Sequence, residues 1–423
     1  MHNRRDFLRN SILAAGALGL RSEAHIVPPL PAQDMDEEKY WKLIREQFPL
    51  SHQKIFLNNG TIGPSPYPVV SSVYKDMMEV DTEARYAGME DEARQALAGF
   101  LGTDKSEISL TRNCTEGINI CCWGLPLREG DEVILSRHEH VGNAGPWLNR
   151  AKLTGIKIKA IPLGQTAEQT LDIVKKTVTR KTKVIALPQI PCTIGQILPT
   201  REICAFAKER GIFSFVDGAH PPGMLETDLH QLGCDMYSGC CHKWMLGPKG
   251  TGFLFVAKDF RNTVQAFYGG GGVDTGWDLL TDPPLLKGYV DDGHRYYYGT
   301  QNASLFQGIV KAVEFHEAIG KEKIEKRVRK LAAYLQENLL KIIPEIEMLT
   351  PVEAISRGAQ IGFRIKGKEM ADLQAHVRKK GIIVRYVPEN NINCLRVSTH
   401  IYNSFKEIDT FLQATEEFAK GSA

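Results

Sequence analysis

An aspartate and a lysine near the middle of the chain are the residue types with the clearest chemical potential. Asp217 ends an apolar segment, and Lys243 follows the next one in the sequence Cys-Cys-His-Lys-Trp. A lysine amine forms an imine with an aldehyde. A carboxylate holds a pyridine nitrogen protonated, so that the ring accepts electrons from a substrate carbanion. Together the two residues predict pyridoxal phosphate chemistry.

A second candidate feature is segment 112–119, Arg-Asn-Cys-Thr-Glu-Gly-Ile-Asn, which follows an expected strand and opens an expected helix. Free N–H groups and the dipole at the start of a helix both favour an anion. Taken alone, Thr115 is also explained as an ordinary helix cap. In the company of Asp217 and Lys243, the segment predicts a phosphate site.

Strand and helix patterns alternate from about residue 90 to residue 257. The elements that they predict position these groups. This alternation is typical of a mostly parallel sheet with helices on both faces, whose ligands lie at the C-terminal ends of the strands. From about residue 303, a long charged helical stretch to Ile343 and then shorter elements predict a second, smaller α+β domain. The expected strands are 109–111, 132–135, 156–161, 184–187, 212–216 and 252–256, and the expected helices are 116–123, 140–152, 167–178 and 199–210.

These motifs, in this order, resemble the class V aminotransferases of fold type I, a family that includes cysteine desulfurases, and within it the isopenicillin N epimerase-like branch. The resemblance runs from about Ile55 to the C-terminus. It implies an α/β, fold type I transferase that depends on pyridoxal 5'-phosphate. It also implies a large cofactor-binding domain at 55–302, with a mostly parallel sheet flanked by helices, and a smaller C-terminal α+β domain at 303–423.

Within this resemblance, Lys243 matches the lysine that binds the cofactor and moves the proton. Asp217 matches the carboxylate that faces the pyridine nitrogen, and His140 matches the histidine that stacks on the pyridine face. These three are the expected catalytic residues. The other matching cofactor contacts are His220 at the ring hydroxyl and Cys114, Thr115, Cys240 and His242 at the phosphate. Positions 114 and 240 commonly carry better hydrogen-bond donors in the family than a thiol.

The resemblance also implies contacts to a substrate and to a second subunit. Arg396 matches the arginine that binds the substrate α-carboxylate with two parallel hydrogen bonds, and Arg385 is a second candidate at the same opening. Asn59 falls at the substrate entrance. Thr300 resembles the residue that reaches the phosphate of the neighbouring subunit, which predicts a homodimer with a shared active site. Cys192 falls near the ring hydroxyl, but we expect it to pack in the core.

The chain departs from the cysteine desulfurases in the loop that carries their nucleophilic cysteine. The corresponding segment, 385–394, lacks the usual His-Cys pair, and Cys394 falls inside an expected strand. We therefore expect an aminotransferase or epimerase acting on the amino-bearing carbon of an amino acid or peptide-linked amino acid. A desulfurase or lyase reaction, or cofactor binding without turnover, are the alternatives. No metal site is expected, because the histidines and cysteines do not follow zinc-ligand spacings.

The N-terminal residues predict an export signal. Arg4 and Arg5 precede a short apolar run at 12–20 and resemble a twin-arginine signal peptide at 1–24, with a linker and helix at 25–54. We expect the twin-arginine machinery to export the folded protein to the periplasm or another extracytoplasmic compartment. The apolar run is too short to span a bilayer. The net charge of +2 equals that of the expected leader, so the chain shows no charge bias towards nucleic acid.

Overall fold

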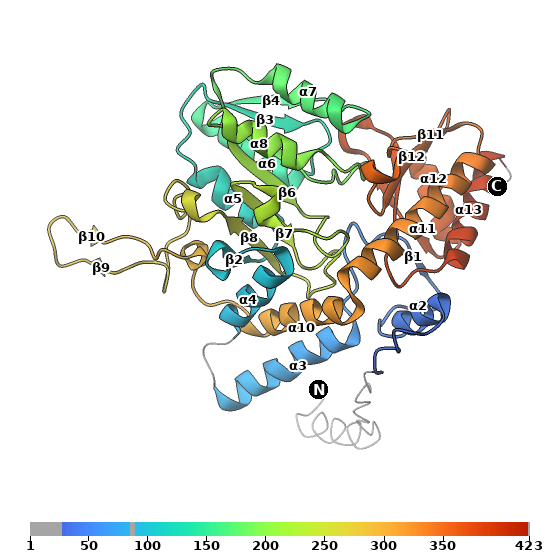
Figure 1. Ribbon diagram of the computed structural model, residues 1–423, viewed down its shortest axis with the longest axis horizontal. Helices are drawn as coiled ribbons and strands as arrows, with labels where there is room; N and C mark the ends of the chain where they lie inside the picture. The colour runs from blue at the N-terminus through green and yellow to red at the C-terminus, as the bar shows by residue number, and fades with distance from the viewer. Residues whose placement is uncertain (1–27, 85–88, 422–423) are drawn as a thin grey trace, which may run out of the picture.

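The structure, a computed structural model, describes residues 28–84 and 89–421 (Figure 1). The expected signal peptide at 1–24 therefore lies outside the described residues. Among the helices of the described part, none is long and apolar enough to cross a membrane.

A seven-stranded sheet forms the centre of the large part of the molecule and is flanked by helices (Figure 1). Its order is β2-β8-β7-β6-β5-β3-β4, and only β8 runs antiparallel to its neighbours. The expected mostly parallel sheet is thus confirmed. Its strands are nearly continuous apolar runs because helices cover the sheet. The bounds are β2 Ile108–Thr111, β3 Glu132–Ser136, β4 Lys157–Ile161, β5 Thr182–Pro188, β6 Phe213–Gly218, β7 Met236–Cys240 and β8 Gly252–Val256.

Four helices of this part, α5, α6, α7 and α9, begin at side chains that cap them. Asn113 Oδ1 accepts a hydrogen bond from the Glu116 amide at 3.0 Å at the start of α5, and Thr166 and Gln169 form a capping box at α7. These caps explain why the helices start close to the expected positions. The bounds are α3 Tyr67–Glu83, α4 Glu90–Leu101, α5 Cys114–Gly124, α6 Val141–Thr154, α7 Ala167–Thr177, α8 Thr200–Glu209 and α9 Leu229–Leu232.

The C-terminal part is an antiparallel sheet of four strands in the order β11-β12-β15-β14, with helices packed against it. The expected helical stretch at 303–343 is two helices, because Gly320 adopts a φ of +101° that ends the first. The bounds are β11 Ile346–Met348, β12 Gln360–Ile365, β14 Arg385–Val387, β15 Cys394–Ser398, α10 Ala303–Ile319, α11 Lys321–Ile342, α12 Met370–Lys379 and α13 Phe405–Ala419.

The two parts are interwoven near the expected boundaries. The short strand β1, Ile55–Phe56, pairs in parallel with β13, Ile382–Ile383, and Asn58 then bridges Ser398. In the other direction, α10 packs on α3 and α4 of the large part. The segment after residue 55 therefore reaches the small sheet just where Arg396 lies. Outside these two sheets and their helices lie α2 Glu37–Arg45 and a projecting hairpin of β9 Trp277–Asp278 and β10 Leu285–Leu286 (Figure 1), and five short 3-10 helices of the described part lie in connecting segments.

Candidate active site

A cavity of about 220 Å³ lies where β6 and β7 end and α5 and α6 begin. Nine of the twelve residues expected in the site line it, although they come from distant segments of the chain. They are Cys114, Thr115, His140, Asp217, Cys240, His242, Lys243, Arg385 and Arg396. The cavity therefore joins the expected cofactor groups to the expected substrate groups.

Asp217 lies buried near the end of β6, with one carboxylate oxygen held by the protein. Its Oδ1 accepts hydrogen bonds from the Ala219 amide at 2.9 Å and from the Cys114 thiol at 3.3 Å. Burial raises the pKa of Asp217, while the Ala219 amide and the Lys243 charge act in the opposite direction. Its other oxygen makes no hydrogen bond with a described residue, so a protonated ring nitrogen fits there.

The Cys114 thiol is directed towards this carboxylate. Its sulfur lies 3.3 Å from Asp217 Oδ1 and 3.0 Å from the Ser238 carbonyl oxygen. Burial raises the pKa of Cys114 well above its usual range, so the residue is a neutral thiol with one proton to donate. The Cys114 thiol also contacts the Cys240 side chain, and its expected contact with a phosphate stays a prediction.

The start of α5 supplies the groups suited to a phosphate. The Asn113 side chain takes the amide of Glu116, whereas the amides of Cys114 and Thr115 precede the first intrahelical bonds. Thr115 adds a hydroxyl at the cavity. His242 Nδ1 donates to the Thr251 carbonyl at 2.9 Å, which fixes the ring beside the Cys240 side chain. These groups fit a phosphate anion at this end of the cavity.

His140 caps α6 in a geometry that fixes its proton. Its Nδ1 accepts the Gly142 amide at 3.0 Å, so the proton of the neutral ring lies on Nε2. Burial lowers the pKa of His140, followed in importance by the nearby Lys243 charge. A neutral, flat imidazole therefore faces the cavity, as stacking on a pyridine ring requires.

Lys243 lies in a tight turn that follows β7 and is held from several sides. The Gly63 amide donates to the His242 carbonyl at 2.9 Å, and a Cβ at position 63 would lie 2.0 Å from the Lys243 carbonyl oxygen. The next residue, Trp244, donates from Nε1 to His220 Nδ1 at 3.1 Å and stacks on His400. The backbone that carries the lysine is therefore closely packed.

Arg396 lies on β15 at the opposite end of the cavity and is 1% exposed. It donates to the Cys192 carbonyl at 2.7 Å, to Thr61 Oγ1 at 2.8 Å and to Asn58 Oδ1 at 3.2 Å. Burial lowers its pKa to about 10, with the charge of Arg385 as the next cause. Its buried Nε has no hydrogen-bond partner, so this guanidinium retains capacity for an anion.

Three of the expected residues do not line the cavity. His220 is buried, accepts from Trp244, and keeps its Nε2 buried without a partner. Asn59 accepts from the Tyr402 hydroxyl at 3.0 Å. Thr300 lines a separate cavity of about 970 Å³. Of the two adjacent asparagines, Asn59 is the residue expected at the substrate entrance, but Asn58 is the one that contacts Arg396.

Two cysteines lie near the substrate end, and only one of them lines the cavity. Cys394 is buried in β15, its sulfur is 3.8 Å from the Thr193 carbonyl, and burial raises its pKa to about 12. Cys192 is buried, as expected, with 4% of its surface exposed, and it also lines the cavity. The turn at 191–195 is folded back towards Arg396, which a single sequence does not show.

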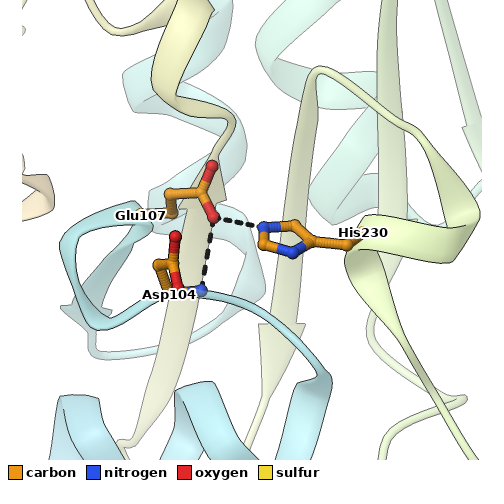
Figure 2. Close-up of side chains that lie close together, drawn as sticks. All are labelled: Asp104, Glu107 and His230. Atoms are coloured by element: carbon orange, nitrogen blue, oxygen red, sulfur yellow. Dashed lines mark hydrogen bonds and ion pairs between the residues drawn. The ribbon is translucent and has the colours of Figure 1, made fainter.

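A second cluster contains side chains that are possible metal ligands: Asp104, Glu107 and His230. Figure 2 shows that the contacts among them run through Glu107. Its Oε2 lies 2.6 Å from His230 Nε2 and accepts from Thr103 Oγ1 at 2.7 Å, while Oε1 accepts the Lys258 amide at 2.8 Å. Both oxygens therefore have partners that tie the start of β2 to neighbouring segments.

Known proteins that are similar to this chain indicate its family. A family model described as aminotransferase class V matches residues 71–411. The chain is 28% identical to isopenicillin N epimerase of Amycolatopsis lactamdurans, over 90% of this chain and 99% of that protein. It is 27% identical to a probable cysteine desulfurase of Pyrococcus abyssi, over 89% and 97%. The apo structure of a cysteine desulfurase from Thermococcus onnurineus matches with a TM-score of 0.81 at 25% identity, covering 92% and 100%.

Proposed function

Because the chain belongs to the class V aminotransferase family and is a pyridoxal-phosphate-dependent enzyme of fold type I, we propose that it moves a proton at the amino-bearing carbon of an amino acid or peptide-linked amino acid, as an aminotransferase or an epimerase. The observation that carries this proposal is the single cavity lined by Lys243, Asp217, His140 and Arg396.

Each of these residues has a distinct part in the proposed reaction. When bound, pyridoxal phosphate accepts the electrons released at the amino-bearing carbon. Asp217 would hold the ring nitrogen through its unengaged oxygen, and His140 would lie against the ring. Lys243 would hold the cofactor and carry the proton to or from the substrate carbon. Arg396 fixes the α-carboxylate, so that the carbon faces the lysine.

Deuterium exchange tests this proposal. The holoenzyme is incubated in D₂O with L- and D-amino acids and short peptides, and the α-proton is followed by NMR. An aminotransferase is expected to form keto acid in an amount equal to that of the enzyme. An epimerase is expected to form the opposite enantiomer carrying deuterium, and no keto acid. The Lys243→Ala variant is expected to do neither. If the native enzyme exchanges the α-proton of none of these compounds, the proposal is contradicted.

Sulfur release from cysteine is a second candidate, supported by the similarity to a probable cysteine desulfurase. Cys394 does not line the cavity, but Cys192 does, beside the backbone carbonyl that binds Arg396. Sulfide release from cysteine that is lost in Cys192→Ala and retained in Cys394→Ala would support this candidate.

A homodimer is the proposed assembly. The proposal is supported by Thr300, which lines the larger cavity, separate from the cavity that contains Lys243. Thr300 resembles the family residue that reaches the phosphate of a neighbouring subunit. Sedimentation of the holoenzyme is expected to give a dimer, and Thr300→Ala is expected to release the cofactor more easily. A monomeric holoenzyme would contradict the proposed assembly.

Export through the twin-arginine pathway is the proposed route to the periplasm or another extracytoplasmic compartment. It is supported by Arg4, Arg5 and the apolar run that follows them. A reporter carrying residues 1–30 is expected to be exported, and changing both arginines to lysine is expected to stop it. Equal export of both fusions would exclude this route.

A further inference from the structure

Two arginines face each other at the substrate end of the cavity. In the pairing of β14 with β15, Arg385 lies directly opposite Arg396, and both side chains line the cavity. Directly opposite residues share one face of a sheet, and like charges in that arrangement destabilise it. A pair of guanidinium groups beside a cavity is therefore suited to anions, since bound anions remove the repulsion.

The chain supplies a carboxylate to only one of the two arginines. Arg385 Nη2 forms an ion pair with Glu389 Oε1, and each side chain is 22% exposed. Arg396 instead uses three of its five N–H groups on neutral oxygens. Among residues 28–84 and 89–421, no carboxylate lies within ion-pair distance of Arg396. That arginine is thus left for the α-carboxylate of the proposed substrate.

The pairing of Glu389 with Arg385 is incomplete. Oε2 of Glu389 is buried and has no hydrogen-bond partner, so its loss of hydration is not compensated. The turn that carries it is held by a hydrogen bond from the Asn390 side chain to the Arg137 carbonyl. The turn is therefore anchored independently of the Glu389 carboxylate, one oxygen of which has no partner.

From this geometry we propose that Arg385 binds a second carboxylate of the substrate, and that Glu389 occupies this position until the substrate replaces it. The inference rests on the proposed function and adds the substrate class, dicarboxylic amino acids. Replacement of one carboxylate by another keeps the charges at the cavity balanced. A neutral side chain gains nothing from Arg385, because it cannot replace the charge of Glu389.

Calorimetric binding of unreactive compounds to the holoenzyme tests the proposal without depending on turnover. Glutarate and its monoamide are of closely similar size and differ in one charge. We expect native enzyme to bind glutarate at least about tenfold more tightly, the effect of one charge-assisted contact. Glu389→Gln is expected to tighten glutarate binding several-fold and to leave the monoamide unchanged, while Arg385→Gln removes the preference.

A matched control is Glu347→Gln, because Glu347 pairs with Arg364 across two strands of the same sheet and does not line the cavity. It is expected to change neither affinity. Equal binding of the two compounds, or weaker glutarate binding in Glu389→Gln, would overturn the proposal. So would L-lysine binding that depends on Glu389. If glutarate binds as expected but no amino acid exchanges its α-proton, the proposed function fails and the anion site stands.

Discussion

At the scale of single residues, the central arrangement is the carboxylate of Asp217 with one oxygen engaged and the other unengaged. The Ala219 amide and the Cys114 thiol both contact Oδ1. A donor on one oxygen orients the carboxylate and favours its ionised form. Cys114 therefore acts through Asp217, as a positioning residue.

Replacing Cys114 tests this positioning. Cys114→Ala removes the donor, and we expect the dissociation constant of pyridoxal phosphate to rise about 2- to 10-fold, the usual range for one hydrogen bond. Cys114→Ser retains a donor and is expected to bind the cofactor as the native protein does. Absorbance titration of the apoenzyme measures this constant. Equal constants in both variants would mean that the thiol contributes packing alone.

The identities of the site residues were predictable to different degrees. Residues in local motifs, such as Asp217 and Lys243, are recognisable because the motif fixes both residue type and position. Cys192 and Glu389 lie in segments between strands. The sequence shows neither that Cys192 lines the cavity nor that Glu389 pairs with Arg385. The side-chain direction of Cys114 likewise depends on β7, which lies more than a hundred residues away in the chain.

At the scale of elements, the turn that carries Lys243 depends on a close backbone approach by segment 58–63. Gly63 faces the Lys243 carbonyl, where a Cβ would lie 2.0 Å from the oxygen. The glycine is required by this approach, since its φ lies outside the left-handed region. The N-terminal segment and the lysine turn therefore form one structural unit.

Gly63→Ala is expected to displace the turn that carries Lys243 and to weaken cofactor binding at least tenfold, because backbone atoms cannot yield as a flexible side chain can. Gly99→Ala is the control, since a Cβ there meets no atom within 4 Å. Cofactor content after dialysis provides the measurement. Full retention of the cofactor by Gly63→Ala would show that the approach is not needed.

The connection from β3 to α6 contains a buried acid next to His140. Glu139 accepts from the Ser136 amide at 2.9 Å and from Asn143 Nδ2 at 2.8 Å. Burial raises its pKa to about 8 from 4.5, despite these hydrogen bonds. The folded protein therefore holds a proton between these pH values that the unfolded chain releases. Its contribution to stability is complete below pH 4.5 and is lost as the pH rises through about 8.

Glu139→Gln keeps a neutral side chain at all pH values. We expect the free energy of unfolding of the native protein to fall more between pH 5 and pH 8 than that of the variant. Urea unfolding at both pH values measures the difference, and the exposed Glu129→Gln variant serves as control. An identical pH dependence in Glu139→Gln and native protein would contradict the buried neutral acid.

At the scale of the whole molecule, the order of strands and helices was predictable and the way the two parts join was not. Alternating apolar and helical periods predict the sheet because its strands are buried on both faces. The pairing of β1 with β13 and the packing of α10 on α3 and α4 depend on contacts between distant segments. The break at Gly320 shows that one glycine divides a stretch whose helical period is continuous.

A buried histidine joins the two parts and predicts how the molecule responds to acid. His400 donates from Nε2 to the Trp244 carbonyl at 3.0 Å and accepts the Ile401 amide at Nδ1. Burial lowers its pKa to about 3 from 6.5. The unfolded chain therefore binds a proton at this residue below pH 6.5, whereas the folded protein does not. The free energy of unfolding falls as the pH falls, because protonation favours the unfolded chain.

From this shift we expect His400 alone to remove on the order of 2 kcal/mol of stability between pH 7 and pH 5. The His400→Asn variant is expected to be less stable at pH 7 but to lose less stability on acidification. Urea unfolding measures both effects. His52→Asn, at an exposed position, is expected to behave as the native protein does. If the free energy of unfolding of His400→Asn falls more between pH 7 and pH 5 than that of the native protein, the account is contradicted.

The most direct test of the central claim is to locate the lysine that holds the cofactor. The holoenzyme is reduced with borohydride, digested, and analysed by mass spectrometry. The account predicts one modified peptide, with the reduced cofactor attached to Lys243, and none from the Lys243→Ala variant. Attachment at any other lysine, or a holoenzyme in which reduction traps no cofactor, would contradict it.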